Sequence, residues 1–153
     1  ADPDNAAAYE DRYETYVAEL DGRTSRIEAA VTTVPERSRL LVTSHDAFAY
    51  FGRRYGFDVQ GIQGISTAGE ATTADIRRVA KLLVDRRIKA VFVESATPRQ
   101  TIDAVLAEAR NQGWTATVGG ELFADAAGSA GTPEGTYIGM VRHNVDLIMG
   151  SLR

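Results

Sequence analysis

Cysteine is absent from this 153-residue sequence, and histidine, proline and tryptophan are scarce. Without cysteine the chain can form no disulfide scaffold, no thiol nucleophile and no cysteine-based zinc site. The longest apolar runs, such as residues 90–93, have only the length of a strand, whereas a membrane-spanning helix needs roughly 18 apolar residues. The printed sequence therefore contains no candidate for such a helix.

Positive charge is also in short supply. The sequence has 17 Lys and Arg residues against 21 Asp and Glu residues, which gives a formal net charge of -4. Nucleic-acid-binding domains depend on a basic surface to neutralise phosphates, so we expect no nucleic-acid partner. With 44% hydrophobic residues, a chain of this length can fold as a single domain without disulfides or a structural metal.

Strand-sized apolar runs alternate with helical periodicities along the chain. Strands are predicted at residues 39–43, 58–63, 89–93 and 115–118. Residues 97–100 (TPRQ) predict a capping box for the helix after the third strand, and a glycine-rich loop is predicted at 119–135 before a terminal helix. This alternation predicts an α/β fold with a four-stranded, mainly parallel sheet flanked by helices.

The chain divides into one long helix, residues 1–34, and one compact α/β domain, residues 35–153. Its opening residues, ADPDN, include no initiator methionine and none of the basic or apolar segments of a signal peptide. They resemble the start of a helix inside a longer protein. We therefore expect the chain to be a fragment or a processed product.

Candidate ligand-binding residues follow the predicted strands, because ligands of open parallel sheets bind beyond the carboxyl ends of the strands. They are His45 and Asp46 after the first strand, Glu94 after the third, and Glu121 and Asp125 after the fourth. One imidazole and several carboxylates at one edge would suit Mn, Fe or Zn.

Each of the histidines and Glu94 also has a structural interpretation. If Ser44 caps the following helix, His45 lies in the first turn, where the helix dipole favours the neutral imidazole that a metal requires. The alternative for His45 is a hydrogen-bonded loop residue. His143 is expected to pack on the surface of the terminal helix. Glu94 is expected to belong to a structural hydrogen-bond network, with metal binding as its alternative, because a buried carboxylate is costly unless it is paired.

The sequence shows no constellation of catalytic residues. It contains no Gly-x-Ser-x-Gly elbow, no Walker A pattern and no dinucleotide-binding fingerprint. No motif therefore supports nucleophilic or nucleotide-dependent catalysis.

Several long segments resemble the C-terminal lobe of the metal-binding solute-binding proteins of ABC transporters. They are LVTSHDAFAYFGRRYGF, GIQGIST, KAVFVES and GELFADAAGSAGTPEGTYIGMVRHNVDLI. The opening segment, DPDNAAAYEDRYETYVAEL, is similar to the long helix that joins the two lobes in that family. The resemblance covers essentially the whole chain, and it implies that the N-terminal lobe is absent from it.

The resemblance also implies a metal site. The family holds its metal between the two lobes with two side chains from each, and the matching positions here are His45 in VTSH and Asp125 in LFAD. Glu94 does not match a family ligand. Two ligands cannot complete the coordination shell, so the single lobe is expected to bind Mn, Zn or Fe weakly or not at all.

The resemblance further implies a place and a set of partners. The whole protein would be an extracytoplasmic receptor, in the periplasm or as a cell-surface lipoprotein, that delivers a divalent metal ion to the membrane permease of an ABC transporter. The lobe alone would leave its cleft face uncovered, so we expect self-association through that face or through the first helix.

The competing hypothesis is a free-standing, flavodoxin-like signalling or enzymatic domain that uses Asp46, Glu94 and Asp125 around Mg. A phosphoacceptor domain of that kind needs an aspartate after the third strand, where this chain has Glu94. It also needs a lysine at the end of a later strand, whereas Lys89 begins a strand.

Overall fold

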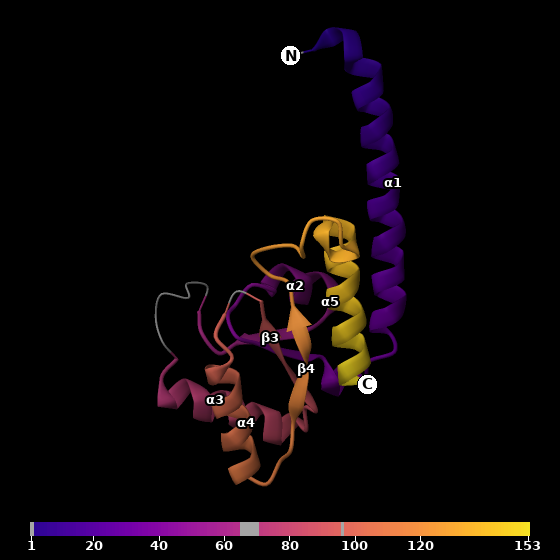
Figure 1. Ribbon diagram of the computed structural model, residues 1–153. Helices are drawn as coiled ribbons and strands as arrows, with labels where there is room; N and C mark the ends of the chain where they lie inside the picture. Colours follow the sequence, from indigo (N-terminus) through magenta and orange to yellow (C-terminus); the bar gives the residue numbers. More distant parts are fainter. Residues whose placement is uncertain (1, 65–70, 96) are drawn as a thin grey trace.

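The computed structural model describes residues 2–64, 71–95 and 97–153 (Figure 1). In chain order its elements are η1 (Pro3–Asn5), α1 (Ala6–Val31), η2 (Glu36–Ser38), β1 (Leu40–Thr43), α2 (Ala49–Tyr55), β2 (Asp58–Gly61), α3 (Thr73–Arg86), β3 (Ala90–Glu94), α4 (Gln100–Asn111), β4 (Thr117–Leu122), η3 (Pro133–Gly135) and α5 (Tyr137–Leu152). None of the helices in the described part of the chain is both long enough and apolar enough to cross a membrane.

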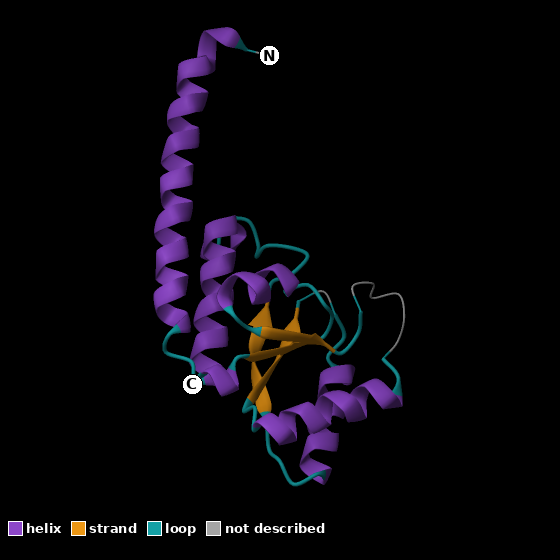
Figure 2. Cartoon of the chain, turned by 180° about the vertical axis from the view of Figure 1, so that it is seen from behind, coloured by secondary structure: helices purple, strands orange, loops and turns teal. Residues whose placement is uncertain are grey.

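The strands form two parallel pairs, β1 with β2 and β3 with β4. Strands β1 and β3 lie next to each other, so the order across the layer is β2, β1, β3, β4. The predicted α/β class with parallel strands is confirmed. The sheet is not one continuous ladder, however, because the described residues show no hydrogen-bonded pairing between β1 and β3. The two pairs run in clearly different directions in Figure 2, and such twisting separates the backbone groups that would pair.

The helices cover both sides of the strands. In Figures 1 and 2, α3 and α4 lie on one side, whereas α5, α2 and the C-terminal part of α1 lie on the other. The two central strands supply the middle of the core, where Leu41, Val42, Val91 and Phe92 have no exposed surface. Burial of such side chains is the main source of stability, at about 1.5–3 kcal/mol for each one.

Helix α1 packs on the rest of the chain through its C-terminal half, where the Arg23 guanidinium lies 4.9 Å from the centre of the Tyr137 ring. Ile27 and Val31 are its buried residues, and both contact the core. Three tyrosines nearer the N-terminus of the helix, Tyr9, Tyr13 and Tyr16, are all more than two-fifths exposed. Figure 1 shows this part of α1 projecting well beyond the compact part of the molecule.

Strand β4 is longer than predicted, because it continues from Thr117 to Leu122 through two glycines assigned to the loop. A Cβ at Gly119 would lie 2.7 Å from the Phe92 ring, and one at Gly120 would lie 2.7 Å from the Leu147 side chain. The glycines therefore let β4 lie close to β3 and α5. The loop begins only after Leu122, which brings Asp125 nearer to the strand end than the sequence indicated.

The predicted capping box at residues 97–100 is wrong. Helix α4 begins at Gln100 without a hydrogen bond from a capping side chain, and the Thr97 hydroxyl lies within bonding distance of the Glu94 carbonyl oxygen instead. A capping box is present at α3, where Thr72 and Asp75 exchange side-chain and backbone hydrogen bonds.

Candidate metal centre

His45 lies in the loop between β1 and α2 and is almost fully buried, with 3% of its surface exposed. The prediction that it lies in the first turn of a helix is wrong, because α2 begins only at Ala49. The loop first packs against the end of β2, where a Cβ at Gly61 would lie 2.6 Å from the backbone nitrogen of Asp46. The hydroxyl of Thr43 also donates to the His45 carbonyl oxygen at 2.7 Å. The imidazole of His45 is therefore not placed at a helix N-terminus.

Glu94 is the last residue of β3 and is 2% exposed. Its Oε1 accepts a hydrogen bond from the backbone N–H of His45 at 3.1 Å, and its Oε2 is in direct contact with Nδ1 of the His45 ring. Burial raises the pKa of the Glu94 carboxyl, and the hydrogen bonds from His45 offset this only in part. The predicted structural network around Glu94 is confirmed. It exists because β1 and β3 lie side by side and end at the same edge.

Asp125 approaches the same imidazole from the other side. It follows β4 on the loop that begins at Phe123, and its Oδ2 lies 3.5 Å from Nε2 of His45. The side chain of Asp125 is 60% exposed, whereas that of His45 is 4% exposed. The sequence predicted that these two residues share one rim of the sheet, and the structure brings them together there.

Asn144 on α5 holds the start of the Asp125 loop. Its side-chain amide donates to the carbonyl oxygen of Phe123 at 2.7 Å, and its Oδ1 accepts from the backbone N–H of Phe123 at 3.0 Å. No motif in the sequence predicted this role for Asn144. The available signal was a polar residue at helical spacing among apolar ones, and in the structure Asn144 is 6% exposed.

The remaining candidates lie outside this rim. Asp46 lines a separate hollow together with Asp75 and Arg78, and Glu121 is an exposed residue within β4. His143 has the structural role that was expected, with Nε2 3.0 Å from the Glu121 carbonyl oxygen and its ring against that of Phe123. Within residues 2–64, 71–95 and 97–153, no three His, Cys, Asp or Glu side chains are grouped to hold a metal ion. The rim brings together two atoms that could bind a metal ion, Nε2 of His45 and Oδ2 of Asp125.

A family model matches nearly the whole sequence. Residues 1–150 match ZnuA, described as the periplasmic component A of a zinc-uptake complex. The chain belongs to the ZnuA family.

Individual relatives of this ZnuA-family chain are named for different metals. The zinc-binding protein TroA of Treponema pallidum is 42% identical over 150 residues, which cover 98% of this chain and 49% of TroA. The manganese-binding lipoprotein MntA of Bacillus subtilis is 44% identical over 99% of this chain and 49% of MntA. The iron ABC transporter substrate-binding lipoprotein MtsA of Streptococcus pyogenes is 30% identical over 99% of this chain and 47% of MtsA.

The fold agrees with this membership. The solved structure of periplasmic TroA from Treponema pallidum matches with a TM-score of 0.94, over 98% of this chain and 54% of that chain. The chain thus spans about half the length of its relatives, and its fold is that of a single lobe. The resemblance to the metal-binding solute-binding proteins is confirmed.

Proposed function

We propose that this chain is the C-terminal lobe of an extracytoplasmic receptor that captures Mn, Zn or Fe and delivers it to the permease of an ABC transporter. Residues 1–34 would be the interlobe helix and residues 35–153 the metal-binding lobe. The observation that carries the proposal is the approach of the His45 imidazole and the Asp125 carboxylate at one open rim. Family membership and the names of the relatives support it.

The spacing of the two donor atoms suits a transition-metal ion. Imidazole and carboxylate ligands lie about 2.0–2.2 Å from Zn²⁺, and two such ligands at a tetrahedral angle are about 3.4 Å apart. Nε2 of His45 and Oδ2 of Asp125 are 3.5 Å apart, so one ion could contact both with little movement. The other ligands would come from the half of the relatives' length that this chain does not cover, or from water. We therefore propose that the isolated chain binds metal weakly.

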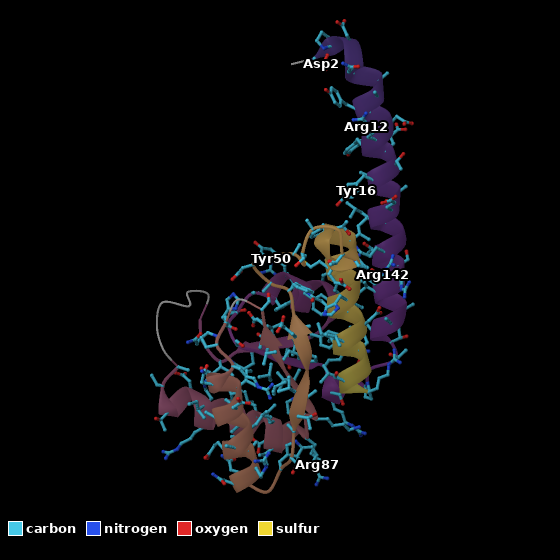
Figure 3. All side chains as sticks on the ribbon, viewed as in Figure 1. Asp2, Arg12, Tyr16, Tyr50, Arg87 and Arg142 are labelled. Atoms are coloured by element: carbon cyan, nitrogen blue, oxygen red, sulfur yellow. The ribbon has the colours of Figure 1, made fainter. Side chains whose placement is uncertain are left out.

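The exposed tyrosines of α1 support the same arrangement. Figure 3 places Tyr16 on the projecting part of α1, above Tyr50 at the upper surface of the compact part. Tyr50 is 84% exposed and Tyr13 is 64% exposed. Tyr9, Tyr13 and Tyr16 recur at helical spacing, and an exposed apolar stripe of this kind is typical of a surface that another protein part covers. We propose that the other lobe covers these residues, and that copies of the isolated chain associate through them.

The geometry argues against the competing Mg-dependent domain. That hypothesis needs the carboxylates of Asp46, Glu94 and Asp125 around one ion. Oε2 of Glu94 is occupied by the His45 ring, and Asp46 lines a different hollow. The relatives are named as binding proteins or transporter components, and we propose that this chain is likewise not an enzyme.

Calorimetric titration of the complete protein with Zn²⁺ and Mn²⁺ tests the proposal. We expect the double variant His45→Ala and Asp125→Ala to lose measurable binding, because half of the coordination shell is removed. The matched control is Asp46→Ala, since this carboxylate is adjacent to His45 in sequence but faces another hollow. Affinity unchanged in the double variant would refute the metal site.

A further inference from the structure

Glu94, His45 and Asp125 form a line of contacts from the core to the solvent. Glu94 is 2% exposed, the His45 side chain is 4% exposed, and the Asp125 side chain is 60% exposed. Both carboxylate oxygens of Glu94 contact His45. One accepts from the backbone N–H of His45, and the other lies against Nδ1 of its ring. Apart from this ring contact, neither Nδ1 of His45 nor Oε2 of Glu94 has a hydrogen-bond partner in the described chain.

This contact selects one form of the imidazole. A neutral imidazole carries its proton on one nitrogen only, and the other nitrogen presents a lone pair. An ionised carboxylate has only acceptor atoms, so its contact with Nδ1 is favourable only when Nδ1 carries the proton; otherwise two lone pairs would face each other. The proton on Nδ1 leaves the lone pair on Nε2, which is the nitrogen nearest to Asp125.

We infer that Glu94 is a positioning residue, which holds His45 in the Nδ1–H tautomer and so directs the Nε2 lone pair toward the rim before any metal arrives. The role of the tautomer in metal binding rests on the proposed function. The tautomer itself follows from the contact between Glu94 and His45 and does not depend on that function. A carboxylate behind a metal-binding imidazole fixes the orientation of the ring and increases the basicity of the free nitrogen. Glu94 thus acts on a bound cation through His45 and without contacting it.

The two contacts of Glu94 allow its positioning role to be separated from a structural role. In Glu94→Gln, the amide oxygen can still accept from the backbone N–H of His45, which keeps the loop attached to β3. The amide group then presents an N–H donor to Nδ1, where the wild type presents an acceptor. Glutamine has nearly the same shape as glutamate, so the packing is retained while the preference at Nδ1 is reversed.

The first measurement is the tautomer of His45 in the complete, metal-free protein. Nitrogen-15 spectra of histidine-labelled protein at neutral pH distinguish the Nδ1–H form from the Nε2–H form, and His45→Ala assigns the signal. We expect Nδ1–H in the wild type and Nε2–H in Glu94→Gln. An Nε2–H form in the wild type would overturn the inference without any variant being needed.

The second measurement is calorimetric affinity for Zn²⁺, with the thermal midpoint of the metal-free protein as the control for folding. We expect Glu94→Gln to bind about 10–100-fold more weakly, the usual effect of changing a group behind a metal ligand, at an almost unchanged midpoint. A switched tautomer with unchanged affinity would overturn the positioning role. Unchanged affinity in the double variant of His45 and Asp125 would instead overturn the proposed metal site, so the two failures are distinguishable.

Discussion

The two side chains that meet at the rim are held in opposite ways. His45 follows a central strand, its side chain is 4% exposed, and Glu94 contacts both its backbone and its ring. Asp125 lies on a loop, and its side chain is 60% exposed. The loop is attached through Asn144, which bonds to the backbone of Phe123. His45 is therefore part of the core, whereas Asp125 lies on a loop attached to the surface of the core.

This difference separates two properties that are often confused. Metal affinity is expected to depend on both donors, because each would supply one bond to the ion. Folding stability is expected to depend on His45 far more than on Asp125, because only His45 has buried polar partners. Substitutions of His45 and Asp125 should therefore have similar effects on metal affinity but different effects on folding stability.

The largest effect on stability is expected for His45→Ala. The substitution leaves the Glu94 carboxyl buried without its ring partner and removes side-chain packing, at a cost of about 2–3 kcal/mol. Asp125→Ala removes an exposed side chain and should change the free energy of unfolding by less than about 0.5 kcal/mol. Chemical denaturation of the metal-free protein measures both values. Equal losses of unfolding free energy in the two variants would contradict the difference between a buried His45 and an exposed Asp125.

Topology predicted a common edge for His45 and Asp125 among several candidates, and the family resemblance selected this pair. Parallel strands place their carboxyl ends at one edge, and both residues lie shortly after such ends. The surroundings of His45 could not be predicted in the same way. Ser44 has the chemistry of a helix cap, but Gly61 lets the loop pack closely on β2, and the helix starts later. Glu94 reaches His45 only because β1 and β3 are neighbours, which no local pattern shows.

A smaller effect is expected from the attachment of the Asp125 loop. Asn144→Ala leaves the part-buried N–H and carbonyl groups of Phe123 without this partner, which should cost about 1–2 kcal/mol. It should also weaken metal binding, because Asp125 is then less well placed, while the tautomer of His45 stays the same. Denaturation, calorimetry and nitrogen-15 spectra test these three expectations together. The control is Asp146→Ala, an exposed residue on the same helix that makes no bond to Phe123. A changed His45 tautomer in Asn144→Ala would mean that the Asp125 loop influences the contact between His45 and Glu94.

The loop after β4 shows a second limit of sequence reasoning. The density of glycine in residues 119–135 correctly predicted irregular structure for most of the segment. Gly119 and Gly120, however, belong to the strand. These positions need glycine because Phe92 and Leu147 occupy the space that larger side chains would fill. A glycine required for close packing looks the same in a sequence as a glycine required for a turn. Only the neighbouring strand and helix, distant in sequence, distinguish the two cases.

Two carboxyl groups repeat the contrast between buried and exposed positions. Burial raises the pKa of Glu94, whereas hydrogen bonds from Thr72 and Arg78 lower the pKa of Asp75 at the exposed start of α3. The hydroxyl of Thr72 donates to Asp75 at 2.6 Å, and the backbone N–H of Asp75 donates back to that hydroxyl at 3.2 Å. The ionised form of Asp75 is thus stabilised in the folded protein.

The smallest predicted effect follows from this capping box. Because the pKa of Asp75 is lower in the folded state, its contribution to stability is complete above the ordinary aspartate pKa of about 4 and is lost as the pH falls through the folded value. Acidification should therefore lower the protection of the amides in the first turn of α3, measured against the intrinsic exchange rate at each pH, before it lowers that of β1 and β3. In Thr72→Ala the largest cause of the lowered pKa is removed, so the Asp75 titration followed by NMR should move upward, toward that of an ordinary aspartate. An unchanged titration would contradict the assigned cause. If the strands instead lost protection first on acidification, the core would be the acid-sensitive region and the comparison between buried and exposed groups would be reversed.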